Sequence, residues 1–478
     1  MVVHQGFVAR FLLRTDVVTT LRDAGTRIVV LTPNHEEPYL RDEFRESGMA
    51  LEPLRASISV VMRSRLWLLL YYLRSYTLGA MTATPALQSK YAGARRQQRS
   101  KSRAVDWLIH AALQVLWRSG LARRALLSLE SLLFSPRLHR DLFEHYQPDL
   151  VVATSPGWFV ADALVLREAR RSGVATAVAV LSWDNPTSKG YRGARPDRMI
   201  AWSERMADQV ANHHDYPRDR IEVCGVPHFD PYRRDGGLWS RDELCSQLGL
   251  DPTRRILVFA TSSPGHHSHN LEVANAIARE VADGSLGAPA QLVVRVHPIY
   301  FRPDHSTPID GFRELTQRHP HVQLDIPEVM SDRLRCDVPQ RDNLRLGSLL
   351  KNCDVLVNVF STTTLEAFLL DKPVVLVSPS GHAFTEYAHI RPLAEGNAAL
   401  IADTPAAVAS HIRTYLRDPA LHSKERRRLA LEECGPSDGL AGERIARRLL
   451  EQMRMVVPPE GPPSPGVREL SVPTSKPS

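Results

Sequence analysis

The sequence predicts an α/β protein made of two doubly wound halves, in each of which helices cover both faces of a parallel sheet. Short runs of apolar and β-branched residues alternate with helix-forming stretches along most of the 478 residues. Most of these runs are apolar throughout, which is typical of parallel strands buried on both faces. The length also suits two domains of about 200 residues each better than one domain.

The first domain is predicted to span 1–228. Its first strand is nearly missing, because only Val2 and Val3 precede a His-Gln-Gly turn; either the strand is a stub or the true start lies upstream. A helix ending at Gly25 and a strand at 27–34 complete the first strand, helix and strand unit. Further strands are expected at 52–55, 149–156, 175–183, 197–203 and 220–227, and helices at 7–24, 158–172 and 204–213.

An insert at about 57–134 interrupts this pattern. Its helices are expected at 57–77, 104–119 and 121–134, and its segment 89–103 carries six cationic residues and no acidic one. An apolar helix flanked by cations is typical of a protein that rests on an anionic membrane surface, so 57–103 predicts such contact. A core-facing helix followed by a solvated loop is the alternative. The longest apolar run, 66–73, is too short to cross a bilayer.

A polar stretch containing Gly and Pro, 229–252, is predicted to be the hinge before a second domain at 253–455. The tail at 456–478 contains seven prolines and is expected to be disordered. Strands of the second domain are expected at 254–263, 291–298, 321–326, 354–360, 373–377 and 399–402, and helices at 269–282, 311–318, 343–351, 365–370, 404–416, 423–433 and 439–454.

Composition excludes several classes of function. The five cysteines are scattered without CxxC spacing, which argues against a disulfide framework or a zinc site and favours a reducing cytosol. The net charge of +7 indicates an anionic substrate or surface, and without a nucleic-acid motif we expect no nucleic-acid partner. His266, His267 and His269 lack partner carboxylates, and no DxD, GxGxxG or GxxxxGK motif occurs. We therefore expect no metal and no bound cofactor.

Polar residues follow the predicted strands of the second domain at the edge where ligands of such sheets bind. Hydroxyls, backbone amides, a guanidinium and an imidazole that converge there can hold a diphosphate. Such a site stabilises a leaving nucleoside phosphate without a metal. The candidate donor residues are Thr261, Ser262, Ser263, Gly265, Arg295, His297, Ser361, Thr362 and Thr363.

The stretch 354–377 is the centre of this predicted site. It reads as strand, hydroxyl-rich turn, helix and strand, so the N–H groups of a helix N-terminus face an anion. Glu366, about one turn inside the helix, is placed to accept the ribose hydroxyls. Alternatively, Glu366 forms a capping box with Thr363, and Arg295 and His297 form a strand-end ion pair or a hydrogen-bonded turn.

Three motifs of the second domain occur in a familiar order: VRVHP, NCDVLVNVFSTTTLEAFLLDKPVV and GPSDGLAGERIARRL. Together with LSWDNPTSKG and PDRMIAWSERMADQVANHHDYPRDRIEVCGVPHFD of the first, they resemble GT-B fold transferases. The resemblance is to the group of bacterial capsule and teichoic-acid CDP-glycerol glycerophosphotransferases and related UDP-N-acetylglucosamine 2-epimerases. It covers about 1–50 and 147–455, and it implies two Rossmann-like domains facing across a cleft and a nucleotide-activated donor.

The resemblance also assigns roles to residues. His297 and Ser361 to Thr363 match positions that hold the donor phosphates, and Glu366 matches a position that often binds ribose. The epimerases carry an HxEAGxR-type segment where this chain has SWDNPTSKG, so epimerisation is disfavoured.

Sugar transfer also needs a base, supplied by the first domain, to take the proton of the acceptor. His4 follows the first strand, where many GT-B enzymes keep a histidine base, and Asp184 follows another strand; we weigh the two equally. The alternatives are a plain loop histidine and an Asx-type turn with Asn185. Trp183, Asn185 and Glu36 are candidates for the acceptor side of the cleft.

These expectations combine into one predicted activity. The protein is expected to move a sugar from a nucleotide-sugar to a glycan, lipid-linked or small-molecule hydroxyl without a metal, in the cytosol or on the inner face of the cytoplasmic membrane. A CDP-glycerol-type glycerophosphotransferase is the first alternative. A nucleotide-sugar isomerase and a scaffold that binds nucleotide without turnover are the others.

Overall fold

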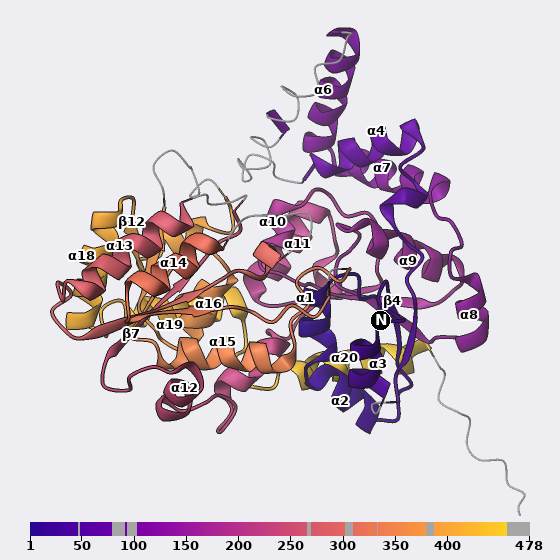
Figure 1. The fold of residues 1–478 in the computed structure, drawn as a ribbon. Coiled ribbons are helices and arrows are strands. Elements are labelled where there is room, and N and C mark those ends of the chain that lie inside the picture. Colours follow the sequence, from indigo (N-terminus) through magenta and orange to yellow (C-terminus); the bar gives the residue numbers. More distant parts are fainter. Residues whose placement is uncertain are drawn as a thin grey trace, which may run out of the picture.

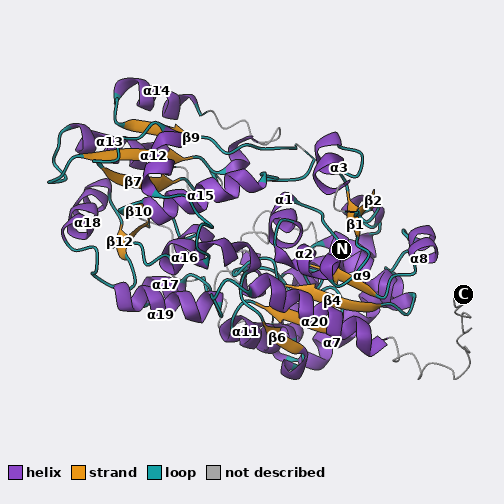
Figure 2. Cartoon of the chain, turned by 90° about the horizontal axis from the view of Figure 1, so that it is seen from below, coloured by secondary structure: helices purple, strands orange, loops and turns teal. Residues whose placement is uncertain are grey.

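The protein was analysed as a computed structural model, which describes residues 1–45, 48–78, 91–92, 103–264, 269–301, 309–331, 333–378 and 387–456. Two α/β halves lie side by side (Figure 1), and helices cover both faces of their sheets (Figure 2). The predicted doubly wound α/β architecture is therefore confirmed. The tail predicted to be disordered, apart from its first residue, and most of the basic segment 89–103 lie outside the described residues.

The second half contains a parallel sheet with the order β12-β11-β10-β7-β8-β9. The order reverses between the central strands β7 (Arg255–Ala260) and β10 (Val355–Asn358), so the switch point, where such sheets bind ligands, lies between them. The other strands are β8 (Ala290–Arg295), β9 (Val322–Asp325), β11 (Val374–Val377) and β12 (Leu400–Ala402). The helices are α13 (Asn270–Ala282), α14 (Asp310–Arg318), α15 (Gln340–Asn352), α16 (Thr362–Leu369), α17 (Arg391–Glu395), α18 (Pro405–Arg417) and α19 (Ser423–Cys434), with the 3-10 turn η6 (Pro298–Phe301).

The first half is joined into one sheet by Val2 and Val3, which form a two-residue strand stub. The backbone N–H of Val2 donates to the carbonyl of Val152 (2.9 Å), and that of Val3 donates to the carbonyl of Leu31 (2.9 Å). The stub therefore lies between β1 and β3, and the switch point of this sheet lies beside it. The strands are β1 (Val29–Thr32), β2 (Ala50–Pro53), β3 (Leu150–Ala153), β4 (Ala175–Ala179), β5 (Arg198–Ala201) and β6 (Ile221–Val223).

The helix predicted at 7–24 is divided. Thr15 is the N-cap of a new helix, because its hydroxyl accepts the N–H of Val17 (3.4 Å). The chain thus forms α1 (Gly6–Val8), the π-helical turn η1 (Ala9–Leu13) and α2 (Asp16–Asp23). The remaining helices of this half are α3 (Pro38–Arg45), α8 (Arg140–Tyr146), α9 (Val160–Arg171), α10 (Asn185–Ser188), α11 (Glu204–His214) and η4 (Arg218–Arg220).

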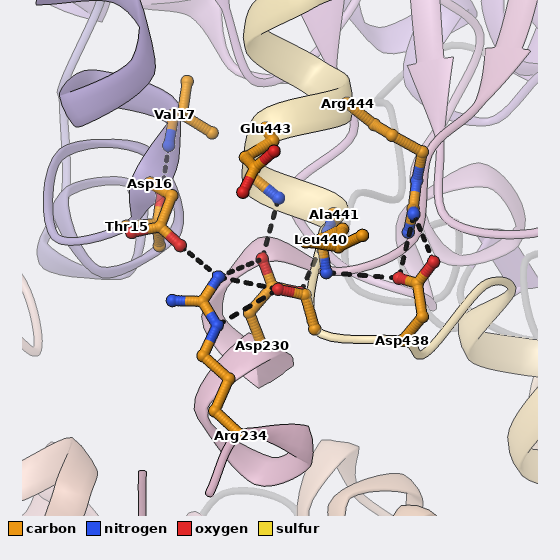
Figure 3. Close-up of polar contacts among 12 residues, drawn as sticks. Thr15, Asp16, Val17, Asp230, Arg234, Asp438, Leu440, Ala441, Glu443 and Arg444 are labelled. Carbon is orange, nitrogen blue, oxygen red and sulfur yellow. Dashed lines mark hydrogen bonds and ion pairs between the residues drawn. The ribbon is translucent and has the colours of Figure 1, made fainter. Parts of the chain in front are cut away.

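The connection between the halves consists of η5 (Pro227–Arg233) and α12 (Arg241–Leu248), within the stretch predicted as the hinge. The last helix, α20 (Ala441–Val456), was predicted to belong to the second domain, but it packs against α2, β3 and β4 of the first. The Asp230 carboxylate accepts the N–H groups of Ala441 (3.0 Å) and Gly442 (2.8 Å) at its N-terminus (Figure 3). A carboxylate at the N-terminus of a helix interacts favourably with the positive end of the helix dipole. The contact of α20 with the connection and with the first half ties the two halves together.

The predicted helical insert is present as η2 (Ile58–Val60), α4 (Arg65–Ser75), α6 (Arg103–Arg118) and α7 (Gly120–Leu133). It stands out from the first half at the top of Figure 1. Its helices pack around a small hydrophobic cluster that is separate from the main core. In the described part of the chain, no helix is both long enough and apolar enough to cross a membrane.

Candidate functional site

The carboxyl ends of the two sheets face each other, because segments that follow strands of one half contact segments that follow strands of the other. The N–H of Gly6, after the stub, donates to the carbonyl of Arg335 (2.9 Å). At a second contact between the halves, the hydroxyl of Thr187, which follows β4, lies 3.1 Å from Nδ1 of His389, which follows β11. Ligands held at either switch point therefore lie between the two halves.

A turn held by side-chain hydrogen bonds follows β7 in the second half, where the donor is predicted to bind. The Asn270 side chain accepts the N–H of Ser262 and donates to its carbonyl (both 3.0 Å), which fixes the backbone beside the switch point. The Thr261 hydroxyl accepts the N–H of His297 (2.9 Å), so these two predicted donor residues are neighbours. Ser263 is half-buried, and the predicted donor residue Gly265 lies outside the described residues, as do His266 and His267.

The N-terminus of α16 carries the predicted hydroxyl cluster. Its N-cap is Ser361, and the Thr364 hydroxyl accepts the Ser361 N–H (3.4 Å) and bonds to Asn358. The capping box suggested for Thr363 and Glu366 is therefore wrong, since Thr364 makes this contact instead. Thr362 and Thr363 are half-buried in the first turn, beside backbone N–H groups that have no partner within the helix.

Arg295 forms a strand-end ion pair, which was the alternative to its predicted phosphate-binding role. Its guanidinium is buried and donates to Asp325 (2.7 Å) and Asp342 (2.5 Å), so its charge is neutralised within the second half. The ion pair is therefore observed, and the phosphate-binding role stays a prediction. A buried cation keeps such partners because an unpaired charge in the interior is costly.

Replacing Arg295 with Lys distinguishes the structural role of Arg295 from the phosphate-binding role. A lysine cannot bridge both carboxylates as the planar guanidinium does, so we expect the free energy of unfolding to fall by about 1–2 kcal/mol. The KM for the donor should stay within about twofold. Urea unfolding and steady-state kinetics measure the two quantities, and a large rise in KM with unchanged stability would restore the phosphate-binding role.

Glu366 lies between the halves rather than in an open site. It is buried, and its Oε2 accepts a hydrogen bond from the Tyr232 hydroxyl of η5 and one from Arg10 (3.4 Å) of η1. Burial and the neighbouring Glu366 raise the pKa of Tyr232 well above its ordinary value, so the phenol stays protonated as the donor. Glu366 thus ties α16 to the hinge and to the first half, and its ribose role stays a prediction.

On the acceptor side, His4 forms a pair that the sequence analysis did not contain. Its Nδ1 lies 3.3 Å from Oδ1 of Asp162, whose Oδ2 accepts the Ser155 hydroxyl (2.7 Å). Asp162 is fully buried in α9, and the ring of Phe159 packs on His4 with centroids 4.7 Å apart. The contact is at ion-pair distance without hydrogen-bond geometry, because neither Nδ1 of His4 nor Oδ1 of Asp162 has a hydrogen-bond partner among the described residues. Asp162 is the carboxylate that faces the imidazole, and the role of His4 as the general base stays a prediction.

Asp184, the other candidate base, is held as a permanent anion. Burial raises its pKa, but nearby His389 and Lys189 and the Ser182 and Ser188 hydroxyls (both 2.6 Å) outweigh burial, so its pKa lies below the ordinary 3.8. A carboxylate with a low pKa and two hydroxyl donors is a weak proton acceptor. The geometry therefore favours His4 over Asp184.

Buried polar atoms without hydrogen-bond partners gather after the strands of the first half. Within the residues that the structure describes, these atoms include Nε2 of His4, Oγ1 of Thr154 after β3 and Nδ2 of Asn185 after β4. Such atoms are rare in folded proteins and call for a ligand or water. These atoms follow the stub, β3 and β4, at the edge of the sheet where an acceptor is predicted to bind.

The other predicted acceptor residues differ in placement. Trp183 is buried and packs edge-on against His389 of the second half, with ring centroids 5.0 Å apart. Glu36 is exposed in the turn after β1, and its contact is with its neighbour His35 (3.7 Å). Trp183 therefore lies between the halves, whereas Glu36 lies on the surface.

Three functional candidates were missed by sequence reasoning. Asp162 had a signal in the sequence, because it is an acidic residue in the first turn of a helix that follows a strand. Arg10 and His389 had no such signal, since their partners are more than 200 residues away in the chain. Arg10 is of particular interest because its buried Nε has no partner among the described residues.

The described residues contain no group of three His, Cys, Asp or Glu side chains that could hold a metal ion. None of the five cysteines forms a disulfide.

No family model matches the chain. The lipid-A-disaccharide synthase of Geobacter sulfurreducens is 25% identical over 371 residues, which cover 71% of this chain and 82% of that protein. The teichoic acid glycerol-phosphate primase of Bacillus spizizenii is 22% identical over 188 residues, 39% of this chain and 42% of the relative.

The fold is also similar to a solved structure, the UDP-GlcNAc 2-epimerase of Neisseria meningitidis bound to UDP-GlcNAc. The TM-score is 0.52 at 10% sequence identity, over 94% of this chain and 98% of that one. The chain therefore has the GT-B fold, and its predicted resemblance to the group that contains these enzymes is confirmed.

Proposed function

We propose that the protein is a glycosyltransferase that moves a sugar from a nucleotide-sugar to an acceptor hydroxyl, in the synthesis of a cell-surface glycan or glycolipid. The observation that carries the proposal is the pair of facing switch points, one with a hydroxyl-rich helix N-terminus and the other with the His4 and Asp162 pair. Relatives named as a lipid-A-disaccharide synthase and a teichoic acid primase support it.

The donor diphosphate is assigned to the second half. The N–H groups at the start of α16, the hydroxyls of Thr362 and Thr363, and His297 would bind its oxygens. Arg10, whose Nε is buried without a partner and whose Nη2 lies 3.4 Å from Glu366 in α16, replaces Arg295 as the cation. These donors stabilise the negative charge that develops on the leaving nucleoside diphosphate.

We assign Nε2 of His4 as the atom that accepts the proton of the acceptor hydroxyl, because Nδ1 faces Asp162. As that proton leaves, the acceptor oxygen bonds to the anomeric carbon, and the bond from this carbon to the diphosphate oxygen breaks. Asp162 stabilises the imidazolium that forms. Asp184 remains an anion throughout and is available to accept a hydrogen bond from the acceptor.

A glycerophosphotransferase is the second candidate, supported by the similarity to the teichoic acid primase over 39% of the chain. The leaving group would then be CMP rather than a nucleoside diphosphate. Epimerisation is not proposed, because SWDNPTSKG lacks the glutamate and arginine of the HxEAGxR-type segment. The cysteines, none in a disulfide, fit a reducing cytosol, where we place the enzyme.

Thermal-shift measurements with UDP, CDP, CMP, GDP and dTDP test the donor site. A nucleotide at one hundred times its Kd should stabilise the fold by about 2.7 kcal/mol and raise the melting temperature. The double substitution of Thr362 and Thr363 by Val should remove most of that rise. Thr316→Val is the matched control, because Thr316 is half-buried in α14 as Thr362 and Thr363 are in α16, and it should leave the rise unchanged.

The identity of the nucleotide also separates the two candidate functions. A rise with UDP, GDP or dTDP supports sugar transfer, and a rise with CMP alone supports glycerophosphotransfer. If none of the five nucleotides shifts the melting temperature, the donor site proposed at α16 is wrong.

A further inference from the structure

The helical insert exposes an unusual amount of apolar side chain. In the part of the chain that the structure describes, 14 of the 17 exposed large hydrophobic residues lie between Ile58 and Leu133. The most exposed are Leu121 (73%), Leu132 (70%) and Trp107 (67%). Monomeric soluble proteins rarely gather such residues on one element, and a gathering of this kind marks an interaction surface.

These residues lie on helices whose other faces are already packed. In α6, Leu113 and Leu116 are buried in the small core of the insert, whereas Trp107, Leu108 and Val115 are exposed. The helices α4 and α7 show the same division between a buried and an exposed apolar face. Helices that are apolar on nearly all sides are buried in a larger core or in a membrane.

The charge of the insert identifies the partner. Residues 57–134 contain twelve Lys and Arg and only two acidic residues, Asp106 and Glu130, while the whole chain has a net charge of +7. The rest of the chain is therefore net negative. Glu130 is buried against Arg74 and Arg167, so its charge does not reach the surface. Exposed cations of the described insert are Arg63, Arg65, Arg118 and Arg124.

The insert is anchored to the acceptor side of the site. Arg74 of α4 donates to the carbonyls of Gly157 (3.0 Å) and Tyr191 (3.1 Å). Gly157 belongs to the loop that leads to Phe159, which packs on His4. Tyr191 follows the short helix α10, whose N-cap is Asp184. Any surface that the insert binds is thus held close to the candidate base.

We propose that the exposed apolar face of η2, α4, α6 and α7 docks on an anionic lipid bilayer, and that the acceptor is presented by a lipid in that bilayer. The statement about the acceptor rests on the proposed function. The apolar side chains of this face can enter the acyl region of the bilayer while the cations of the insert contact anionic headgroups. A bilayer also binds scattered apolar side chains without the shape complementarity that a protein partner needs. Pairing of two inserts would bring two strongly positive surfaces together.

Vesicle flotation of the full chain tests the docking without requiring catalysis. We expect the protein to float with vesicles of phosphatidylethanolamine and phosphatidylglycerol at low salt, and much less with phosphatidylcholine alone. The double variant L121E/L132E should reduce binding at least tenfold, and Arg118→Ser about fivefold. Leu431→Glu, at a residue that is 64% exposed on α19, is the matched control and should bind like the wild type.

Three results would overturn the docking proposal: no flotation of the wild type, equal loss with Leu431→Glu, or a wild-type dimer in solution that L121E/L132E converts to a monomer. Nucleotide-induced thermal shifts of the same variants separate this failure from failure of the proposed function. If the protein floats with the vesicles but no nucleotide raises its melting temperature, the docking proposal stands and only the proposal of a lipid-presented acceptor is wrong.

Discussion

Replacing His4 with Ala should lower kcat by about 10²- to 10⁴-fold, the range that a positioned general base contributes. The substitution removes the imidazole that faces the buried carboxylate of Asp162 and leaves the fold intact, because the polar atoms of the ring make no hydrogen bond to the described residues. Asp162→Asn should lower kcat by a smaller factor, since the base remains but is poorly oriented. Single-turnover assays with saturating donor measure the chemical step directly.

The pH profile distinguishes His4 from Asp184. A histidine base loses activity as the pH falls, because a protonated imidazole cannot take the proton of the acceptor. Asp184 has a pKa below 3.8, because His389, Lys189 and two hydroxyls outweigh its burial, so it would keep the rate constant down to about pH 4. We expect an acid limb in the wild type that disappears in the residual activity of His4→Ala.

The half-buried His35, in the turn after β1, provides the control for this experiment. His35→Ala should retain the wild-type rate and the wild-type pH profile. If His4→Ala keeps more than about a tenth of the wild-type kcat while Asp184→Asn abolishes turnover, Asp184 is the base and the pairing with Asp162 is structural.

The doubly wound fold could be predicted because it depends on local patterns. Each buried parallel strand is an apolar run, and the stub of Val2 and Val3 was recognisable because the following helix and strand completed its unit. The place of α20 could not be predicted, because its packing depends on Asp230, which is more than 200 residues earlier in the chain. Periodicity indicates that a helix is amphipathic and does not indicate which domain it covers.

The site could be predicted where its residues follow strands. His4, Thr261, His297 and the hydroxyls of α16 all lie at the carboxyl ends of their sheets. Arg295 also follows this rule, yet its charge is neutralised by Asp325 and Asp342 from later elements of the same domain. Position along the chain therefore places a side chain at the correct edge, whereas its ionic partners depend on tertiary contacts that a single sequence does not reveal.

The buried ion triad under the insert gives the largest expected effect on stability. Glu130 of α7 accepts from Arg74 of α4 (2.8 Å) and lies 2.9 Å from Arg167 of α9, and all three side chains are buried. Glu130→Ala leaves two guanidinium groups without a counter-ion in the interior. Breaking a buried pair in this way costs about 3–5 kcal/mol, and urea unfolding should show a loss of that size.

The pH dependence of this loss follows from the pKa of Glu130. Burial raises the pKa of this carboxyl, but Arg74 and Arg167 outweigh burial, so it is lower in the folded protein than the ordinary 4.5. A lowered carboxyl pKa stabilises the fold above about pH 4.5, and this contribution is lost as the pH falls through the folded-state pKa. The difference between wild type and Glu130→Ala should therefore be full at pH 7 and shrink below pH 4.

The exposed pair of Arg140 and Glu144 in α8 is the matched control, because it has a similar distance (2.6 Å) without burial. Glu144→Ala should cost far less than Glu130→Ala, because solvent screens an exposed helix pair. Since the triad includes Arg74, which also holds the loop beside His4, Glu130→Ala should lower kcat as well as stability. A variant within about 1 kcal/mol of the wild type and equally active would show that the insert is held by its apolar contacts rather than by this triad.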